Sequence, residues 1–146
     1  MLCDFGGSRD GYCSDITRMF SVGEPSWQVR DAYAALVDAQ EAAVQSAVVG
    51  VFCESVDRVA RDALDAAGLG DRFVHRTGHG IGMDAHEDPY LVAGNRDALV
   101  AGHVFSIEPG VYIAGEFGLR LEDIVVAADE GPVRLNQAPR DLAIVG

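Results

Sequence analysis

Two acidic residues near the start of this 146-residue chain are spaced so that a β-hairpin would bring them together. In an antiparallel hairpin without bulges, the residue numbers of cross-strand partners have a constant sum. If the turn in GGSRDG is centred between Arg9 and Asp10, that sum is 19, and Asp4 lies directly opposite Asp15. Like charges at opposed positions destabilise a hairpin, since their Cβ atoms are only ~4.5–5.5 Å apart.

A second hairpin in the last third of the chain repeats the arrangement. A turn centred on Gly115 gives a sum of 230, which places Glu108 opposite Glu122. A simpler interpretation is that these acidic residues belong to a solvent-exposed acidic surface. Their apolar neighbours, in stretches such as LCDFG and FSIEPGVY, argue against it. Two opposed pairs of carboxylates in one small chain therefore indicate a bound cation.

The donor set narrows the kind of cation. Carboxylates together with a histidine suit Mn²⁺, Fe²⁺, Co²⁺ or Zn²⁺ better than a metal that prefers thiolates. Two such ions ~3.5–4 Å apart share bridging carboxylates and activate water in many hydrolases. Arg120 lies two residues before Glu122 and hence on the same strand face, so we expect it to neutralise and orient a ligand carboxylate from behind.

The elements that must position these residues follow from the periodicity. Two helices with apolar residues at helical spacing are expected, one opening at Pro25 and Ser26, the second stopping at Gly68 and Gly70. Strands joined by turn-rich segments precede and follow them. The predicted strands are 2–6, 12–20, 103–113 and 118–127, with a further short one near 133–135, and the predicted helices run to about 48 and from about 52 to 64.

Residues 68–102 form a long stretch of a different kind. The stretch is rich in glycine, holds three of the four histidines and shows little sustained periodicity. A long irregular segment inside a compact domain is usually functional or disordered, and the histidines favour function.

Composition excludes several classes of protein. Eleven basic against 23 acidic residues give a net charge of −12, whereas a phosphate-backbone binder is normally basic, so no nucleic-acid partner is expected. No run of 18 apolar residues is present, so no membrane span is expected. Three scattered cysteines do not make a disulfide framework or a zinc finger, and we expect a reducing, cytoplasmic setting.

With these motifs assembled, the chain resembles the catalytic domain of the dinuclear-metal "pita-bread" peptidases of family M24. This family includes Xaa-Pro dipeptidase (prolidase), aminopeptidase P and methionine aminopeptidase. The stretches that carry the resemblance are DFGGSRDGYCSDITR, HRTGHGIGMDAHEDP, FSIEPGVY and GLRLED, in the family's order. The resemblance implies an α+β pita-bread fold, here incomplete, in which helices cover an antiparallel sheet.

The resemblance also implies a set of metal ligands. Two divalent ions are expected, Mn²⁺ foremost, with Co²⁺, Zn²⁺ or Fe²⁺ as alternatives. Asp15 and Glu122 would bridge the two ions. The full ligand set would be Asp4, Asp15, His79, Glu108 and Glu122.

Catalytic roles follow from the same resemblance. Glu108 would take a proton from the nucleophilic water and pass it to the leaving amine. His86 would contact the substrate carbonyl and the tetrahedral intermediate, and His75 would line the pocket beside the scissile bond. His103 matches no functional position of the family, so a structural or surface role is expected for it.

Within the family, GLRLED favours the proline-directed branch. Methionine aminopeptidases usually carry a glutamine where this chain has Arg120. The expected activity is metal-dependent hydrolysis of the bond before proline, in Xaa-Pro dipeptides or at peptide N-termini. The short hairpin between Glu108 and Glu122 favours the small, dipeptidase-like members. Three alternatives remain open: a methionine aminopeptidase, a truncated non-catalytic module that binds metal or protein, and a creatinase-like hydrolase of a non-peptide C–N bond.

The resemblance implies that residues 1–146 are a partial catalytic domain. The N-terminal domain and the first part of the catalytic domain, which relatives carry, would be absent. Strand 2–6 would then be an exposed sheet edge, and apolar surface would be uncovered. We therefore expect the chain alone to associate into homodimers or larger species.

Overall fold

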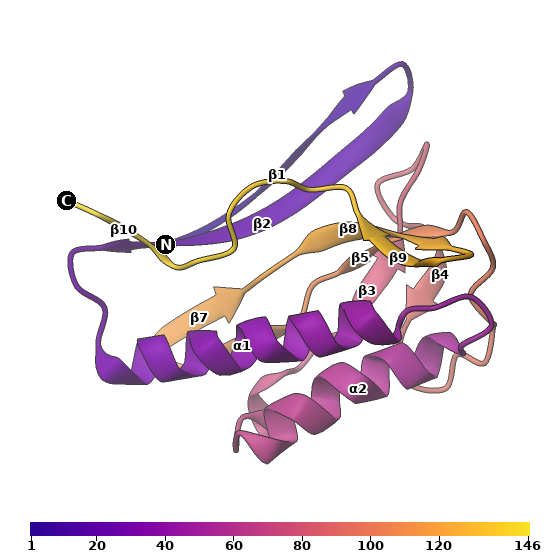
Figure 1. The fold of residues 1–146 in the computed structure, drawn as a ribbon. Helices are drawn as coiled ribbons and strands as arrows, with labels where there is room; N and C mark the ends of the chain where they lie inside the picture. Colours follow the sequence, from indigo (N-terminus) through magenta and orange to yellow (C-terminus); the bar gives the residue numbers. More distant parts are fainter.

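The computed structural model describes all residues 1–146, which form an α+β fold of two layers. Two helices, α1 (Trp27–Ser46) and α2 (Cys53–Ala66), pack side by side along one face of antiparallel sheets (Figure 1). Both agree with the helices expected from the apolar periodicity. The side chain of Ser26 accepts a hydrogen bond of 3.3 Å from Val29 N, which caps α1 where the sequence predicted its start.

The hairpin of β1 (Leu2–Arg9) and β2 (Tyr12–Val22) has a register that differs from the predicted one. Asp10 and Gly11 both adopt positive φ, 53° and 87°, as a two-residue type I′ turn requires. The cross-strand sum is therefore 21, not 19. Asp4 faces Thr17, and Asp15 faces Gly6, so the predicted direct opposition of Asp4 and Asp15 is wrong. The shift is two residues, so both carboxylates stay on the same face of the hairpin.

The second hairpin has the predicted register but is interrupted. Both of its ladders keep the sum of 230, so this register is confirmed. Glu108 and Glu122 fall in the gap between the two ladders, where Leu121 N donates to Pro109 O at 3.3 Å. Each predicted strand is thus divided in two, giving β5 (Val104–Ile107), β6 (Gly110–Ile113), β7 (Phe117–Arg120) and β8 (Asp123–Ala128).

The glycine-rich stretch 68–102 is more ordered than the sequence indicated. It contains a 3₁₀ turn (Gly70–Arg72) and two short strands, β3 (Gly78–Gly80) and β4 (Glu87–Leu91). These strands extend the main sheet, whose order is β4-β3-β5-β8-β9, where β9 is Gly131–Arg134. A strand of three residues with two glycines shows no alternation of apolar and polar residues, which explains why periodicity missed it.

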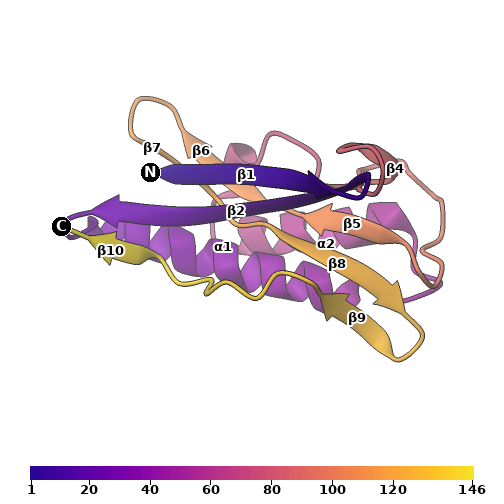
Figure 2. The ribbon, with the colours of Figure 1, turned by 90° about the horizontal axis from the view of Figure 1, so that it is seen from above.

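The core lies between the helices and the main sheet. Leu36 of α1, Leu64 of α2 and Phe105 of β5 are among its fully buried side chains. β10 (Ala143–Val145), which the sequence did not predict, pairs in parallel with β2 and brings the C-terminal segment alongside it (Figure 2).

β1 is the edge strand of the small sheet, whose order is β1-β2-β10. Phe5 and Tyr12 on this hairpin are both more than 60% exposed. The exposed edge agrees with the expectation from the sequence, while the association of chains that we inferred from it stays a prediction. Neither helix is long and apolar enough to cross a membrane.

Candidate metal centre and substrate cleft

Three of the predicted ligands converge at the junction of the two sheets. One potential ligand atom from each of Asp15, His79 and Glu122 lies within 4.8 Å of the other two. Asp15 comes from β2, and His79 from β3. Glu122 precedes β8 and is joined to β2 by an isolated bridge with Thr17. The pairing of strands that are distant in sequence thus builds the cluster.

Glu122 is buried, and only one of its two carboxylate oxygens has a hydrogen-bond partner. Its Oε2 accepts a hydrogen bond of 2.7 Å from the Thr17 hydroxyl, whereas its Oε1 is buried with no partner. Burial, followed by repulsion from Glu108, raises the pKa of Glu122 to about 8. A buried acceptor without a partner costs folding free energy. A cation beside Oε1 would supply the contact that this oxygen lacks and would offset the repulsion from Glu108.

Asp15 is in a related situation. Burial and the negative charge of Asp4 raise the pKa of Asp15, although its Oδ1 accepts a hydrogen bond of 3.0 Å from Ile16 N. Two carboxylates whose ionisation is disfavoured, placed together beside a histidine, form an oxygen and nitrogen donor set that fits a divalent ion.

His79 has one ring nitrogen fixed and one directed at the cluster. Its Nδ1 lies 3.0 Å from Gly80 O, which makes Nδ1 a hydrogen-bond donor. Nε2 is then the ring nitrogen that could bind a metal ion. Nε2 lies 3.1 Å from Glu108 Oε1. Burial opposes a charge on the ring, but the contacts with Glu108 and the Gly80 carbonyl outweigh it and raise the pKa of His79.

Glu108 sits beside this cluster at the end of β5. Ser106 Oγ donates a hydrogen bond of 3.0 Å to Glu108 Oε1, and Arg120 Nε lies 3.8 Å from Oε2. Burial opposes ionisation, yet the hydrogen bond with His79, together with Ser106 and Arg120, lowers the pKa of Glu108. Glu108 is therefore ionised at neutral pH.

Asp4 lies at the edge of the cluster rather than within it. Its carboxylate forms an ion pair with Arg120, which also donates to the Tyr112 hydroxyl at 3.2 Å and to Thr17 Oγ1 at 3.3 Å. The register of the hairpin accounts for this position, because Asp4 faces Thr17 and reaches Asp15 only diagonally. Arg120 is thus placed between two of the predicted ligands, Asp4 and Glu108.

The two other predicted histidines flank the cluster. The ring of His86 is exposed and lies 4.0 Å from the His79 ring, centroid to centroid. His75 Nε2 lies 3.0 Å from the Tyr112 hydroxyl. Burial lowers the pKa of both rings, with a further contribution at His86 from the charge on His79. Both are therefore neutral at pH 7. His103 lies outside this group, where its Nδ1 accepts a hydrogen bond of 3.4 Å from Val100 N.

An open cleft of about 710 Å³ lies over these residues. Arg76 and Tyr90 form part of its wall, with the Arg76 guanidinium 5.1 Å from the centre of the Tyr90 ring. The lining residues are Asp4, His75, Arg76, His86, Tyr90, Val92, Glu108 and Arg120.

Sequence reasoning missed several residues of the site. Thr17 and Ser106 each lie two residues from a predicted ligand, so alternation along the strand would have placed them on the same face. Tyr112 lies four residues after Glu108 and follows the same parity. Arg76 and Tyr90 come from separate parts of the glycine-rich stretch, and no local pattern in the sequence relates them.

Comparison with known proteins identifies the chain's relatives. Residues 1–129 match the sequence model of Metallopeptidase family M24. The chain is 50% identical over 146 residues to a probable dipeptidase PepE of Mycobacterium tuberculosis, covering 99% of this chain and 39% of that protein. It is 43% identical over 145 residues to an Xaa-Pro dipeptidase of Lactobacillus helveticus, with coverage of 99% and 39%.

Solved structures give the same result for the fold. The crystal structure of dipeptidase PepE from Mycobacterium ulcerans superposes with a TM-score of 0.97 at 52% identity, covering 99% of this chain and 39% of that one. The likeness extends over both helices and all the sheets, so the architecture is the pita-bread fold in part. The chain spans about two fifths of the length of these relatives.

Proposed function

Because the chain belongs to metallopeptidase family M24, we propose that it carries the metal centre of a dipeptidase that hydrolyses the bond before proline in Xaa-Pro dipeptides. Relatives named dipeptidase and Xaa-Pro dipeptidase align over nearly all of its length. Because it spans about two fifths of those proteins, residues 1–146 are proposed to be part of a catalytic domain.

One observation carries this proposal: the convergence of Asp15, His79 and the buried Glu122, whose carboxylate oxygen Oε1 has no hydrogen-bond partner. Structural ion pairs satisfy their buried acceptors, whereas Glu122 Oε1 is buried without a partner. Burying two carboxylates together beside a histidine costs free energy when the site is empty, and a bound cation would offset that cost.

Two divalent ions are proposed for this centre, with Mn²⁺ the first choice and Co²⁺, Zn²⁺ or Fe²⁺ as alternatives. Asp15 and Glu122 would be shared between them, and His79 would offer Nε2. Asp4 and Glu108 would complete the set once their contacts with Arg120 and His79 are exchanged for the ions. When bound, the ions supply Lewis acidity that makes water nucleophilic near neutral pH and polarises the scissile carbonyl.

Glu108 is placed to move protons during the reaction. Its carboxylate is ionised at neutral pH and is oriented by the Ser106 hydroxyl, so it can accept the proton of an attacking water. The same carboxyl group can then deliver that proton to the leaving amine. No covalent intermediate with the protein is needed.

Neutral imidazoles would assist the same step. An Nε2–H or Nδ1–H of His86 can donate to the carbonyl oxygen as negative charge develops on it. His75, held by the Tyr112 hydroxyl and the Arg76 carbonyl, would shape the pocket next to the scissile bond. Their lowered pKa values keep both rings neutral, so each ring retains one N–H that can donate a hydrogen bond and adds no positive charge to the cleft.

Arg76 supports a dipeptide rather than a longer peptide as substrate. Arg120, the other arginine of the cleft, is already paired with Asp4 and Glu108. Arg76 instead rests on the Tyr90 ring, and its Nε is buried without a hydrogen-bond partner. A free α-carboxylate, which a dipeptide presents one residue beyond the scissile bond, would satisfy this guanidinium.

Two measurements test the proposal in sequence. Calorimetric titration of chelator-stripped chain with Mn²⁺ is expected to give about two ions per chain. The loaded chain is then assayed for release of proline from an Xaa-Pro dipeptide, with its Glu108→Gln variant alongside. Metal binding without turnover would contradict the proposed activity and favour a non-catalytic metal-binding module.

The exposed β1 edge supports a proposal on association. Edge strands with free backbone groups readily pair with another chain. We propose that the chain forms homodimers or larger species, and light scattering that gives a stable monomer at tens of micromolar would contradict this.

A further inference from the structure

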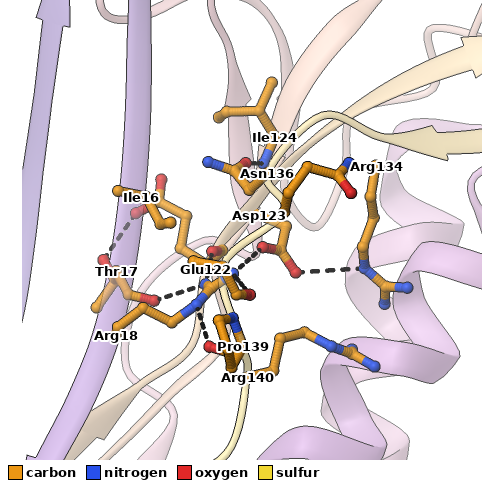
Figure 3. Close-up of polar contacts among 12 residues, drawn as sticks. Ile16, Thr17, Arg18, Glu122, Asp123, Ile124, Arg134, Asn136, Pro139 and Arg140 are labelled. Atoms are coloured by element: carbon orange, nitrogen blue, oxygen red, sulfur yellow. Dashed lines mark hydrogen bonds and ion pairs between the residues drawn. The ribbon is translucent and has the colours of Figure 1, made fainter.

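The segment 136–140, here called the C-terminal strap, is joined by hydrogen bonds to the segments that carry Asp15 and Glu122, and none of its residues lines the cleft. It lies between β9 and β10 in the chain and runs beside the start of β8 towards β2 (Figure 2). Figure 3 shows polar contacts that join it to Arg18 of β2 and to Ile124 of β8.

Asn136 is the first contact of the strap with the cluster. Its Nδ2 donates to the backbone carbonyl of Asp15 at 3.0 Å. Its Oδ1 accepts from the backbone N–H of Ile124 at 2.6 Å, two residues after Glu122. One side chain therefore bridges the main chains of β2 and β8 at Asp15 and at Ile124, and Figure 3 shows its contact with Ile124.

Arg18 provides the second contact and is almost completely buried. Its Nη1 donates to the backbone carbonyl of Glu122 at 2.6 Å and to that of Thr17 at 3.0 Å. The remaining donors reach the strap, with Nη2 3.0 Å from Ala138 O and Nε 2.9 Å from Pro139 O. One planar guanidinium thus binds backbone carbonyls of β2, of Glu122 and of the strap at the same time.

A buried carboxylate balances the charge of Arg18. Asp123 Oδ1 lies 2.6 Å from Arg18 Nη2, and Asp123 Oδ2 accepts from Gln40 Nε2 of α1 at 3.1 Å. Arg134 Nε lies 3.2 Å from the same oxygen. Through Asp123 and Gln40 this network connects the main chain next to Glu122 to helix α1, which belongs to the buried core. Figure 3 shows Asp123 between Arg18 and Arg134.

These contacts matter because little else sets the distance between the two carboxylates. Asp15 lies in β2, and Glu122 immediately precedes β8 of the other sheet. The two segments are joined there by the isolated Thr17–Glu122 bridge and by the hydrogen bond from the Thr17 hydroxyl to Glu122 Oε2. No continuous ladder of backbone hydrogen bonds holds the two segments together, and any charge that the two carboxylates carry drives them apart. The side chains of Asn136 and Arg18 supply the missing connection.

We propose that Asn136 and Arg18 are positioning residues which, through the strap, hold Asp15 and Glu122 at the spacing that two metal ions need to share them. This inference rests on the proposed metal centre. It assigns to two residues that touch neither metal nor substrate a role in the affinity and the geometry of the metal pair.

The test compares metal binding by the chelator-stripped chain and three variants. Calorimetry with Mn²⁺ is expected to show that Asn136→Ala weakens binding by at least tenfold. Arg18→Lys keeps a positive charge beside Asp123 but loses the fork of donors, and we expect it to weaken binding as well. Gln137→Ala is the matched control, because the exposed Gln137 side chain lies on the same strap but donates to Leu135 O, at 3.4 Å, and does not contact the main chains of the cluster.

A spectroscopic readout separates positioning from general stability. Two Mn²⁺ ions that share carboxylates give an exchange-coupled electron paramagnetic resonance spectrum, and that coupling depends on their spacing. Asn136→Ala is expected to change or lose the coupled signal at saturating metal, whereas Gln137→Ala retains it. Thermal melts of the metal-free proteins show whether the variants lose comparable stability.

Several outcomes would overturn the inference. These are unchanged affinity and coupling in Asn136→Ala, full affinity in Arg18→Lys, or an equal loss in Gln137→Ala. Absence of Mn²⁺ binding by the unaltered chain would overturn the inference together with the metal centre. Mn²⁺ binding without proline release would contradict the proposed peptidase activity alone and leave the positioning role in place.

Discussion

The hydroxyl of Ser106 joins the backbone of His79 to the carboxylate of Glu108. It accepts a hydrogen bond of 3.0 Å from His79 N and donates one of 3.0 Å to Glu108 Oε1, which in turn lies 3.1 Å from His79 Nε2. A proposed ligand and the proposed proton carrier are therefore held by one small side chain between β3 and β5. Their relative position is fixed by the sheet rather than by a loop.

Replacement of Glu108 by glutamine tests its role in proton transfer. The amide has the shape of the carboxyl group but cannot accept a proton, so we expect kcat for Xaa-Pro hydrolysis to fall by roughly 10²–10⁴-fold. Glu116→Gln, in an exposed turn, is the matched control and should leave kcat unchanged. Steady-state kinetics on the metal-loaded proteins measures both, and a Glu108→Gln enzyme of normal kcat would remove Glu108 from the mechanism.

The stability of the metal-free chain should fall as the pH rises from about 4.5 to 8. Burial raises the pKa of Glu122 to about 8, so the folded chain binds a proton there that the unfolded chain releases near its ordinary pKa of 4.5. Stability from this group is complete below the unfolded pKa and is lost as the pH passes through the folded one. The slope from this group is at most about 1.4 kcal/mol per pH unit. Urea unfolding in the presence of a chelator, at several pH values, measures it.

Glu122→Gln is the control for that experiment. A glutamine cannot ionise, so its chain should lose the downward slope between pH 4.5 and 8 while keeping the Thr17 hydroxyl as a partner. Equal slopes in the two proteins would assign the pH dependence to another group.

Binding of metal at pH 7 should release protons. Glu122 is largely protonated there, and the pKa of His79 is raised, yet both must be deprotonated to act as ligands. Titration with Mn²⁺ in two buffers of different ionisation enthalpy gives the number of protons released. We expect about one or more per chain, decreasing as the pH is raised towards 9. A heat of binding that is the same in both buffers would contradict the pKa assigned to Glu122.

The helices and the second hairpin were predictable because their signals are local. Apolar residues at helical spacing and the Ser26 cap placed α1 within two residues at each end, and the turn around Gly115 gave the register of Glu108 and Glu122. The first hairpin was misread because Asp10 and Gly11 can both adopt positive φ and together form the turn. Recognition of that dipeptide would have given the correct partner for Asp4.

The rest of the site depends on contacts between distant segments. Arg76 meets Tyr90 only because β3 and β4 pair, and each strand is too short and too rich in glycine or polar residues to show a period. Likewise, nothing near Asn136 in the sequence indicates that it contacts Asp15, 121 residues away. Such pairings arise from tertiary packing, and a local pattern does not contain them.

Arg76→Ala should impair recognition of a free C-terminus. Loss of a hydrogen-bonded charge pair costs about 1.5–3 kcal/mol, so we expect KM for an Xaa-Pro dipeptide to rise by roughly 10–100-fold with kcat little changed. The same dipeptide with an amidated C-terminus should already be a poor substrate of the unaltered enzyme and be little affected by the substitution. A similar rise in KM for both substrates would mean that Arg76 does not bind the carboxylate.

Gly78→Ala should dislodge His79 from the cluster. A Cβ at Gly78 would lie 1.8 Å from the backbone oxygen of Ser106, and this oxygen cannot move without separating β3 from β5. We expect a loss of stability of about 1–3 kcal/mol or more from overpacking, together with weaker Mn²⁺ binding because the His79–Ser106 hydrogen bond is broken. Gly7→Ala is the matched control, since its Cβ would meet only Ser14 Oγ, at 4.0 Å. Urea unfolding and Mn²⁺ titration measure the two effects, and normal stability of Gly78→Ala would show that β3 and β5 do not need so close an approach.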